Sequence, residues 1–159
     1  MYEEISIPNS VMKQFDLTNC NAVITGGAGF LGRQFAETIA ELNGNPLLID
    51  INENELKKVG ESLIDIGYKK FSSYVVDISD EKKCKEAYKI IWKENNGIDL
   101  LINGAALTKA GIESSDNNFF APFECTDQNL WDAGLKVNLT ATQFSCKIFG
   151  KKMAEKGKG

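Results

Sequence analysis

A glycine-rich segment between an apolar run and an amphipathic run constrains the fold more than any other feature. It reads Thr25-Gly26-Gly27-Ala28-Gly29-Phe30-Leu31-Gly32 and contains the spacing Gly-x-Gly-x-x-Gly. The apolar run before it is typical of a buried strand, and apolar residues recur at helical spacing after it. Glycines at these positions permit a tight turn, close approach of the backbone to a pyrophosphate, and close packing of helix on sheet. The segment therefore predicts a strand, a phosphate-binding turn and a helix, in that order.

The same alternation continues along the chain. Apolar runs predict strands at 22–25, 47–49, 74–76 and 98–102, and periodic runs predict helices at 30–42, 52–66, 79–95 and 127–152. The residues at 43–46, Asn-Gly-Asn-Pro, predict a turn. This order predicts an α/β fold with a doubly wound parallel sheet, a Rossmann fold. Its strands are expected in the order 3-2-1-4, truncated relative to the six-stranded fold, with an unpaired apolar edge at Ile98, Leu100, Leu101 and Ile102.

A carboxylate at the end of the second predicted strand supports a dinucleotide site. Asp50 lies 18 residues after Gly32 and is expected to bind the ribose 2′-hydroxyl. A carboxylate there would repel a 2′-phosphate, so NAD(H) is predicted over NADP(H). Arg33 is the nearby basic residue that could favour NADP(H). The alternative interpretation of the glycine segment is an ordinary turn between strand and helix.

Composition argues against several functional classes. The 159 residues carry a net charge of −4 without a dense basic stripe, which argues against nucleic-acid binding. The apolar runs are too short to cross a membrane, and the first residues lack the features of a secretion signal, so a cytoplasmic protein is expected. The chain has no histidine, which excludes an imidazole base. Four scattered cysteines predict reduced thiols and no metal site: Cys20, Cys84, Cys125 and Cys146.

From Thr25 onward the chain resembles the N-terminal Rossmann portion of the short-chain dehydrogenase/reductase family. The resemblance rests on the glycine segment and on three later segments: Val76-Asp77-Ile78, Asn103-Gly104-Ala105-Ala106, and Trp131-Asp132 followed by Lys136-Val137-Asn138-Leu139. It implies that Asp77 lies beside the adenine ring and that the segment from Asn103 lines the cofactor pocket. It also implies that Asn138 is catalytic and supports a proton relay through water.

The candidate cofactor-binding residues are Thr25, Gly26, Gly27, Gly29, Phe30, Leu31, Gly32, Asp50, Ile51, Asp77, Ile78, Asn103, Gly104, Ala105 and Ala106. Three of the polar side chains also have purely structural interpretations. Asp77 could cap a helix, Asn103 could form a turn at the end of a strand, and Asn138 could be a satisfied polar group on a mostly buried helix.

Two features of the glycine segment and the last helix bear on the subclass. Phe30 stands where the single-domain branch of the family has glycine, and the spacing Gly26-x-x-Gly29-x-x-Gly32 is similar to the extended branch of sugar-nucleotide epimerases and dehydratases. The Asn103 and Asn138 segments favour the single-domain branch. The glycine segment and residues 145–150 are also similar to proteins of bacterial surface-glycan or flagellin modification.

The family's catalytic serine and Tyr-x-x-x-Lys pair are not found in this sequence. Its tyrosines are Tyr2, Tyr68, Tyr74 and Tyr88, and the residues four positions later are Ser6, Ser72, Ile78 and Trp92. We expect residues 1–18 to be a loosely held lead-in, because they are polar. Residues 19–159 are expected to be the cofactor-binding part of a longer oxidoreductase that is inactive alone.

Three hypotheses of function follow. The parent protein could transfer a hydride between nicotinamide and a carbonyl or secondary alcohol, as a homo-oligomer in contact through the helix near Asp127. The chain could instead be a non-catalytic NAD(H)-binding module, or a poorly folded fragment that associates through its edge strand. A small-molecule substrate is expected. The loop 107–125 fits a sugar or sugar-nucleotide through Lys109, Glu113, Asp116, Phe119 and Phe120, and the same residues also fit a plain exposed loop.

Overall fold

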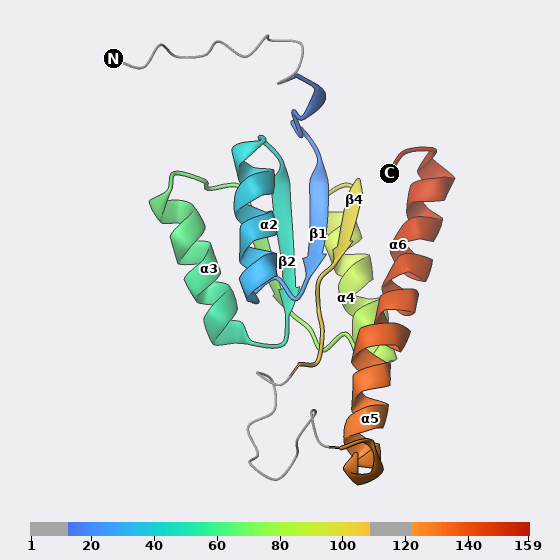
Figure 1. The fold of residues 1–159 in the computed structure, drawn as a ribbon. Helices are drawn as coiled ribbons and strands as arrows, with labels where there is room; N and C mark the ends of the chain where they lie inside the picture. Colours follow the sequence, from blue (N-terminus) through green and yellow to red (C-terminus); the bar gives the residue numbers. More distant parts are fainter. Residues whose placement is uncertain (1–12, 109–121) are drawn as a thin grey trace.

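The computed structural model describes residues 13–108 and 122–159. In these ranges one parallel sheet contains β1 (Asn21–Thr25), β2 (Asn45–Asp50), β3 (Ser72–Val75) and β4 (Leu100–Asn103). The strand order is β3-β2-β1-β4, which confirms the predicted topology (Figure 1). Within the described part of the chain, β4 pairs with β1 alone and forms one edge of the sheet, although Ile98 just before it is buried.

Helices cover both faces of the sheet. The helix α2 (Phe30–Glu41) and α3 (Glu53–Asp65) enclose one core, into which Ala22 and Ile24 of β1 point. The helices α4 (Glu81–Glu94) and α6 (Thr142–Lys156) enclose the other core, which contains Val23 (Figure 1). Successive strand residues point to opposite faces, so a strand buried on both sides is apolar throughout. The predicted doubly wound α/β architecture is confirmed.

The start of β2 differs from the predicted turn at 43–46. Asn45 and Pro46 belong to the strand, and the Asn45 amide donates to the Cys20 carbonyl at 2.8 Å. The nitrogen of the next residue therefore faces the β3 side, where pairing starts only at Leu47. Proline is tolerated near the start of a strand when no partner needs its missing N–H. Composition alone favoured a turn because Asn, Gly and Pro are common in turns.

The lead-in is attached to the fold where the structure describes it. The Leu17 amide donates to the Leu42 carbonyl at 2.7 Å, and the Leu17 side chain packs against the core beneath α2. Asp16 accepts a hydrogen bond from Asn43 at 3.1 Å. The prediction of a loosely held segment is therefore wrong for residues 16–18, and residues 1–12 lie outside the described ranges.

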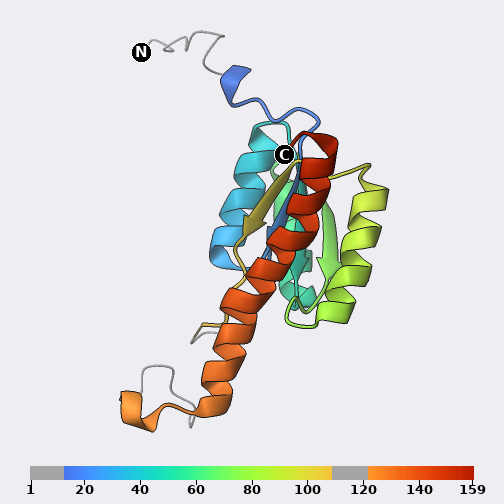
Figure 2. The same cartoon turned by 90° about the vertical axis from the view of Figure 1, so that its right-hand side faces the viewer.

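The long helix predicted at 127–152 is divided into segments. A short 3₁₀ turn, η2 (Phe123–Cys125), precedes α5 (Gln128–Leu135), and the π-helical segment η3 (Lys136–Ala141) joins α5 to α6. The run continues to Lys156 and extends beyond the sheet at the α5 end (Figure 2). A π turn adds one residue without changing the apolar spacing on either side, so periodicity cannot detect it. No helix in the described ranges is long and apolar enough to cross a bilayer.

Candidate functional site

A hollow of about 400 Å³ lies where the carboxyl ends of the strands meet. In open α/β sheets, ligands bind outside this edge, at the point where the strand order reverses. Here that point lies between β1 and β4, because the chain leaves β1 toward β2 and returns to the other side. Seven of the predicted cofactor-binding residues line the hollow: Gly26, Asp50, Ile51, Asp77, Ile78, Ala105 and Ala106.

Sequence reasoning missed five further lining residues: Ile49, Asn52, Val76, Leu107 and Val137. Four of them are neighbours of predicted residues and follow from the same strand ends. Val137 comes from η3, and its contribution depends on how that segment approaches the sheet. The adjacent Asn138 was the available signal.

The glycine turn brings backbone atoms together where a side chain could not fit. Gly26 has a φ of +69°, and a Cβ there would lie 2.7 Å from Cα of Ala105 and from the carbonyl oxygen of Gly104. A Cβ on Gly32 would collide with the carbonyl oxygen of Gly26. The turn is closed by a hydrogen bond from the Gly29 amide to the Gly26 carbonyl at 3.0 Å. The Gly32 contact is the close packing of helix against strand that the spacing of the glycines predicts.

The first turn of α2 presents its amides without a competing side chain. Gly29 occupies the N-cap position, no side chain caps the helix, and its first turn contains no acidic residue. The side chains of Phe30 and Leu31 are exposed and do not line the hollow. Unsatisfied amides and the helix dipole together favour an anion such as a phosphate.

Asp50 ends β2 and connects two parts of the site. One carboxylate oxygen accepts the Ala28 amide of the glycine turn at 3.1 Å, and the other accepts the Asn52 amide at 3.0 Å. The carboxylate thus holds the glycine turn and the start of α3 at the rim of the hollow. Asn52 caps α3 by accepting the Glu55 amide at 3.1 Å.

Arg33 is held away from the carboxylate of Asp50. Its Nε lies 2.9 Å from Glu37, and its Nη2 donates to the Ser62 hydroxyl of α3 at 2.7 Å. These two interactions hold the guanidinium between α2 and α3. Arg33, the basic residue near Asp50 in the sequence, is therefore engaged by other side chains.

Asp77 lies just after β3, and Asn103 is the last residue of β4. Asp77 accepts the Ser79 amide at 2.9 Å, whereas the cap of α4 is Asp80, which accepts the Lys82 and Lys83 amides. The helix-cap interpretation of Asp77 is therefore wrong. Asn103 donates to the Cys146 sulfur at 3.3 Å. The two following residues hold β4 to β1, because the Gly104 amide binds the Thr25 carbonyl and the Ala105 amide binds the Thr25 hydroxyl.

Both polar atoms of the Asn138 side-chain amide bind the backbone of one residue, Leu107. Its Oδ1 accepts the Leu107 amide at 2.7 Å, and its Nδ2 donates to the Leu107 carbonyl at 3.3 Å. Asn138 is therefore a satisfied polar group, as the structural interpretation predicted, but it is exposed and does not lie on a mostly buried helix. Asn138 instead ties η3 to the rim of the hollow, where Leu107 lies.

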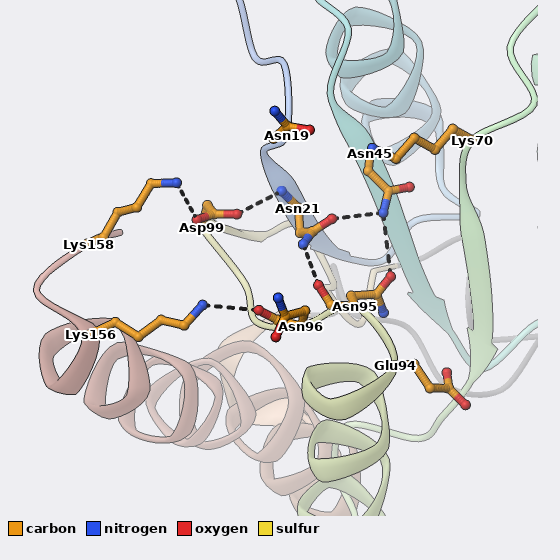
Figure 3. A pocket seen from close by; sticks show the side chains of 10 residues that line it. All are labelled: Asn19, Asn21, Asn45, Lys70, Glu94, Asn95, Asn96, Asp99, Lys156 and Lys158. Carbon is orange, nitrogen blue, oxygen red and sulfur yellow. Dashed lines mark hydrogen bonds and ion pairs between the residues drawn. The ribbon is translucent and has the colours of Figure 1, made fainter.

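A second hollow, of about 480 Å³, lies at the opposite, amino end of the strands (Figure 3). Its side chains are polar and bind one another. The Asn21 amide group donates to the carbonyls of Asn95 and Gly97 and accepts from Asn45 at 2.9 Å. Lys158 pairs with Asp99 at 3.0 Å. These bonds fasten β1, β2 and the ends of α4 and α6 together, so we place the functional site at the carboxyl edge.

The loop predicted to contact a sugar-like ligand lies mostly outside the described residues, which resume at residue 122.

The four cysteines are all unbridged. Cys84 is buried, and burial raises the pKa of its thiol to about 11. Cys125 and Cys146 are exposed.

The sequence is similar to known proteins over nearly all of its length. A family model described as short chain dehydrogenase matches residues 20–159. The short chain dehydrogenase/reductase dpmpG of Macrophomina phaseolina is 27% identical over 143 residues, 90% of this chain and 77% of that protein. D-threitol dehydrogenase of Mycolicibacterium smegmatis is 27% identical over 151 residues, 94% of this chain and 54% of that protein.

Solved structures show the same fold. NAD⁺-bound xylitol dehydrogenase matches with a TM-score of 0.79 at 23% identity, over 90% of this chain and 51% of that one. A metagenomic short-chain oxidoreductase in complex with NADP matches with a TM-score of 0.79 at 22% identity, over 91% and 61%. The chain thus spans about half the length of the threitol and xylitol dehydrogenases. None of these four proteins supports the narrower prediction of a role in surface-glycan or flagellin modification.

Proposed function

Because the chain belongs to the short-chain dehydrogenase family, we propose that it is the cofactor-binding part of an NAD(H)-dependent oxidoreductase. The carrying observation is that the glycine turn, Asp50, Asp77 and the Ala105 segment converge on one hollow. Segments far apart in the sequence meet there because the strands are parallel and their carboxyl ends share one edge. When bound, a nicotinamide dinucleotide supplies the ring that gives or accepts a hydride.

The residues present fit such a cofactor. The missing Cβ atoms of Gly26 and Gly32 leave space for backbone packing, and the uncapped first turn of α2 suits the pyrophosphate. Asp50 at the rim suits a ribose hydroxyl, and Asp77 with Ile78 suits the adenine. The Ala105 to Leu107 segment and the adjoining Asn138 are left for the nicotinamide end.

We infer a preference for NAD(H) over NADP(H). Asp50 places a carboxylate where a 2′-phosphate would carry further negative charge, and Arg33 is occupied by Glu37 and Ser62. Two charges of like sign within a few ångströms repel by about 1 to 4 kcal/mol, depending on exposure. One solved neighbour contains NAD⁺ and another contains NADP, so the preference rests on these side chains.

For the longer protein we propose a small polyhydroxylated alcohol, or the corresponding carbonyl compound, as substrate. D-threitol and xylitol dehydrogenases are named for polyols, which agrees with the predicted sugar-like ligand. We also propose that the protein is a homo-oligomer. Exposed apolar side chains on α5 and η3, Trp131, Leu135 and Leu139, would be covered in such an assembly.

The chain by itself is expected to show no turnover. Its sequence has no tyrosine four residues before a lysine, so the proton donor and acceptor of this family is missing. The rate of NADH oxidation in the presence of small ketones, followed by the absorbance of NADH, should equal the rate without protein. A rate above that background that survives purification to homogeneity would contradict this expectation.

NMR chemical-shift mapping tests the proposed site. On addition of NADH, the amides of Gly26, Asp50, Asp77 and Ala105 should shift together, while those around Asn21 and Asp99 at the other end of the strands should not. Shifts confined to the amino end, or no shifts at millimolar NADH in a folded chain, would overturn the proposal.

A further inference from the structure

The π-helical segment η3 is bordered by two side-chain hydroxyls that bind its carbonyls. The Thr142 hydroxyl donates to the Asn138 carbonyl at 3.2 Å, and the Ser145 hydroxyl donates to the Ala141 carbonyl at 2.9 Å. In each pair the carbonyl belongs to the residue four positions earlier, about one helical turn before the hydroxyl. Hydroxyls that bind the carbonyl four residues earlier compete with the backbone ladder and bend helices.

Ser145 is in turn held by a tyrosine on another helix. The Tyr88 hydroxyl of α4 lies 2.7 Å from the Ser145 hydroxyl, and both residues are buried. Because the Ser145 hydrogen is directed to Ala141, the tyrosine must be the donor in this pair. Burial raises the pKa of the Tyr88 hydroxyl above its ordinary value, so it keeps the proton that it donates. The ring of Tyr88 packs on Phe149, with ring centroids 4.4 Å apart.

This chain of bonds leads from the core to the candidate site. It starts in α4, passes through Ser145 to the carbonyl of Ala141, and so reaches the C-terminal end of η3. The same segment contains Asn138, which binds Leu107, and Val137, which lines the hollow. The exposed part of the site is thereby connected to a fully buried anchor.

We propose that Tyr88 and Ser145 are positioning residues that hold η3 in its π-helical form and so fix Asn138 against Leu107 at the rim of the hollow. This deepens the proposed function and rests on it for the role of the site. Packing alone would not need the hydroxyls, because two apolar groups of the same shape can replace a buried hydrogen-bonded pair at little cost. The hydroxyls matter because that of Ser145 binds the backbone carbonyl of Ala141, the last residue of η3.

The test uses four variants of the whole chain: Ser145→Ala, Tyr88→Phe, the double variant Tyr88→Phe/Ser145→Ala, and Tyr74→Phe as the matched control. Tyr74 also has a bonded hydroxyl, which donates to Glu94 at 3.0 Å, but it lies in β3, away from η3. For each variant, NMR gives the hydrogen-exchange rate of the Leu107 amide and the side-chain amide shifts of Asn138, without any cofactor. Thermal unfolding is recorded in parallel.

Ser145→Ala strands the Tyr88 hydroxyl and should lower the unfolding midpoint, whereas the double variant removes that hydroxyl and should recover most of the loss. The hydrogen-exchange rate of the Leu107 amide should nevertheless rise about tenfold in Ser145→Ala and in the double variant, because both lose the hydrogen bond that restrains η3. The Asn138 side-chain shifts should move in both and stay unchanged in Tyr74→Phe. If the double variant regains the unfolding midpoint while its Asn138 side-chain shifts stay changed, the two residues position Asn138 and do more than stabilise the fold.

A stable double variant with unchanged Leu107 exchange and Asn138 shifts would overturn the inference. If neither Ser145 variant folds, Tyr88→Phe, which removes a single oxygen, decides by the same two signals. Failure of the wild-type chain to bind NADH would instead count against the proposed function. It would leave the Leu107 and Asn138 signals unaffected, so the two failures are distinguishable.

Discussion

Alanine in place of Gly26 is expected to abolish NADH binding and to lower the free energy of unfolding by roughly 2 to 4 kcal/mol. The φ of +69° is unfavourable for a residue with a Cβ. The new Cβ would also lie 2.7 Å from backbone atoms of Gly104 and Ala105. Backbone atoms cannot move aside as a flexible side chain can, so β1 and the Ala105 segment must separate. That separation distorts the hollow itself.

Gly67→Ala is the matched control for this variant. Gly67 has a φ of +97°, yet a Cβ there would meet no atom within 4 Å. It should therefore lose only the conformational part of the stability, about 1 to 2 kcal/mol, and bind NADH as the wild type does. Urea unfolding and calorimetric titration of both variants give the comparison. Equal losses in the two, or retained NADH binding in Gly26→Ala, would show that the close approach at β1 is not needed.

Replacement of Asp50 is expected to change cofactor choice. Asp50→Ala should weaken NADH binding by roughly tenfold to a hundredfold, the usual effect of losing a hydrogen bond to a charged group. Part of this loss would come from the glycine turn, since Asp50 also accepts the Ala28 amide. Asp50→Asn removes the charge and keeps one oxygen, which can still accept either the Ala28 or the Asn52 amide. In that variant the preference for NADH over NADPH should narrow by about tenfold, because repulsion of the 2′-phosphate is relieved.

Asp65→Asn controls for the change in net charge. Asp65 is exposed at the end of α3 and does not line the hollow. Competition binding of NADH and NADPH to the wild type, Asp50→Asn and Asp65→Asn gives the ratio of dissociation constants directly. An unchanged ratio in Asp50→Asn would show that the carboxylate does not select the cofactor.

The sheet could be predicted from the sequence because its order depends on signals that are local. Each strand contains or adjoins a short apolar run, the connections up to β4 are short, and the glycine turn identifies the first crossover. Pro46 was misassigned because its place in β2 depends on where β3 begins, which is a property of the sheet. The segment η3 was missed because its cause is a hydroxyl bonded to a buried tyrosine on another helix.

The candidate site could be predicted as far as motifs at strand ends reach. Gly26, Asp50, Asp77 and Ala105 meet because parallel strands bring their carboxyl ends together. The partners of individual side chains were out of reach. That Arg33 bonds Ser62, and that Asn138 bonds the backbone of Leu107, depends on how helices pack on the sheet. No spacing in the sequence contains that information.

Calorimetric titration of the purified chain with NADH, repeated with NADPH, tests the central claim most directly. We expect saturable binding of one NADH per chain, with NADPH bound more weakly, from a protein whose circular dichroism shows helix and strand. Such a result would establish a folded cofactor site that prefers NADH. A folded chain that releases no heat with either dinucleotide, or that binds NADPH more tightly, would contradict it.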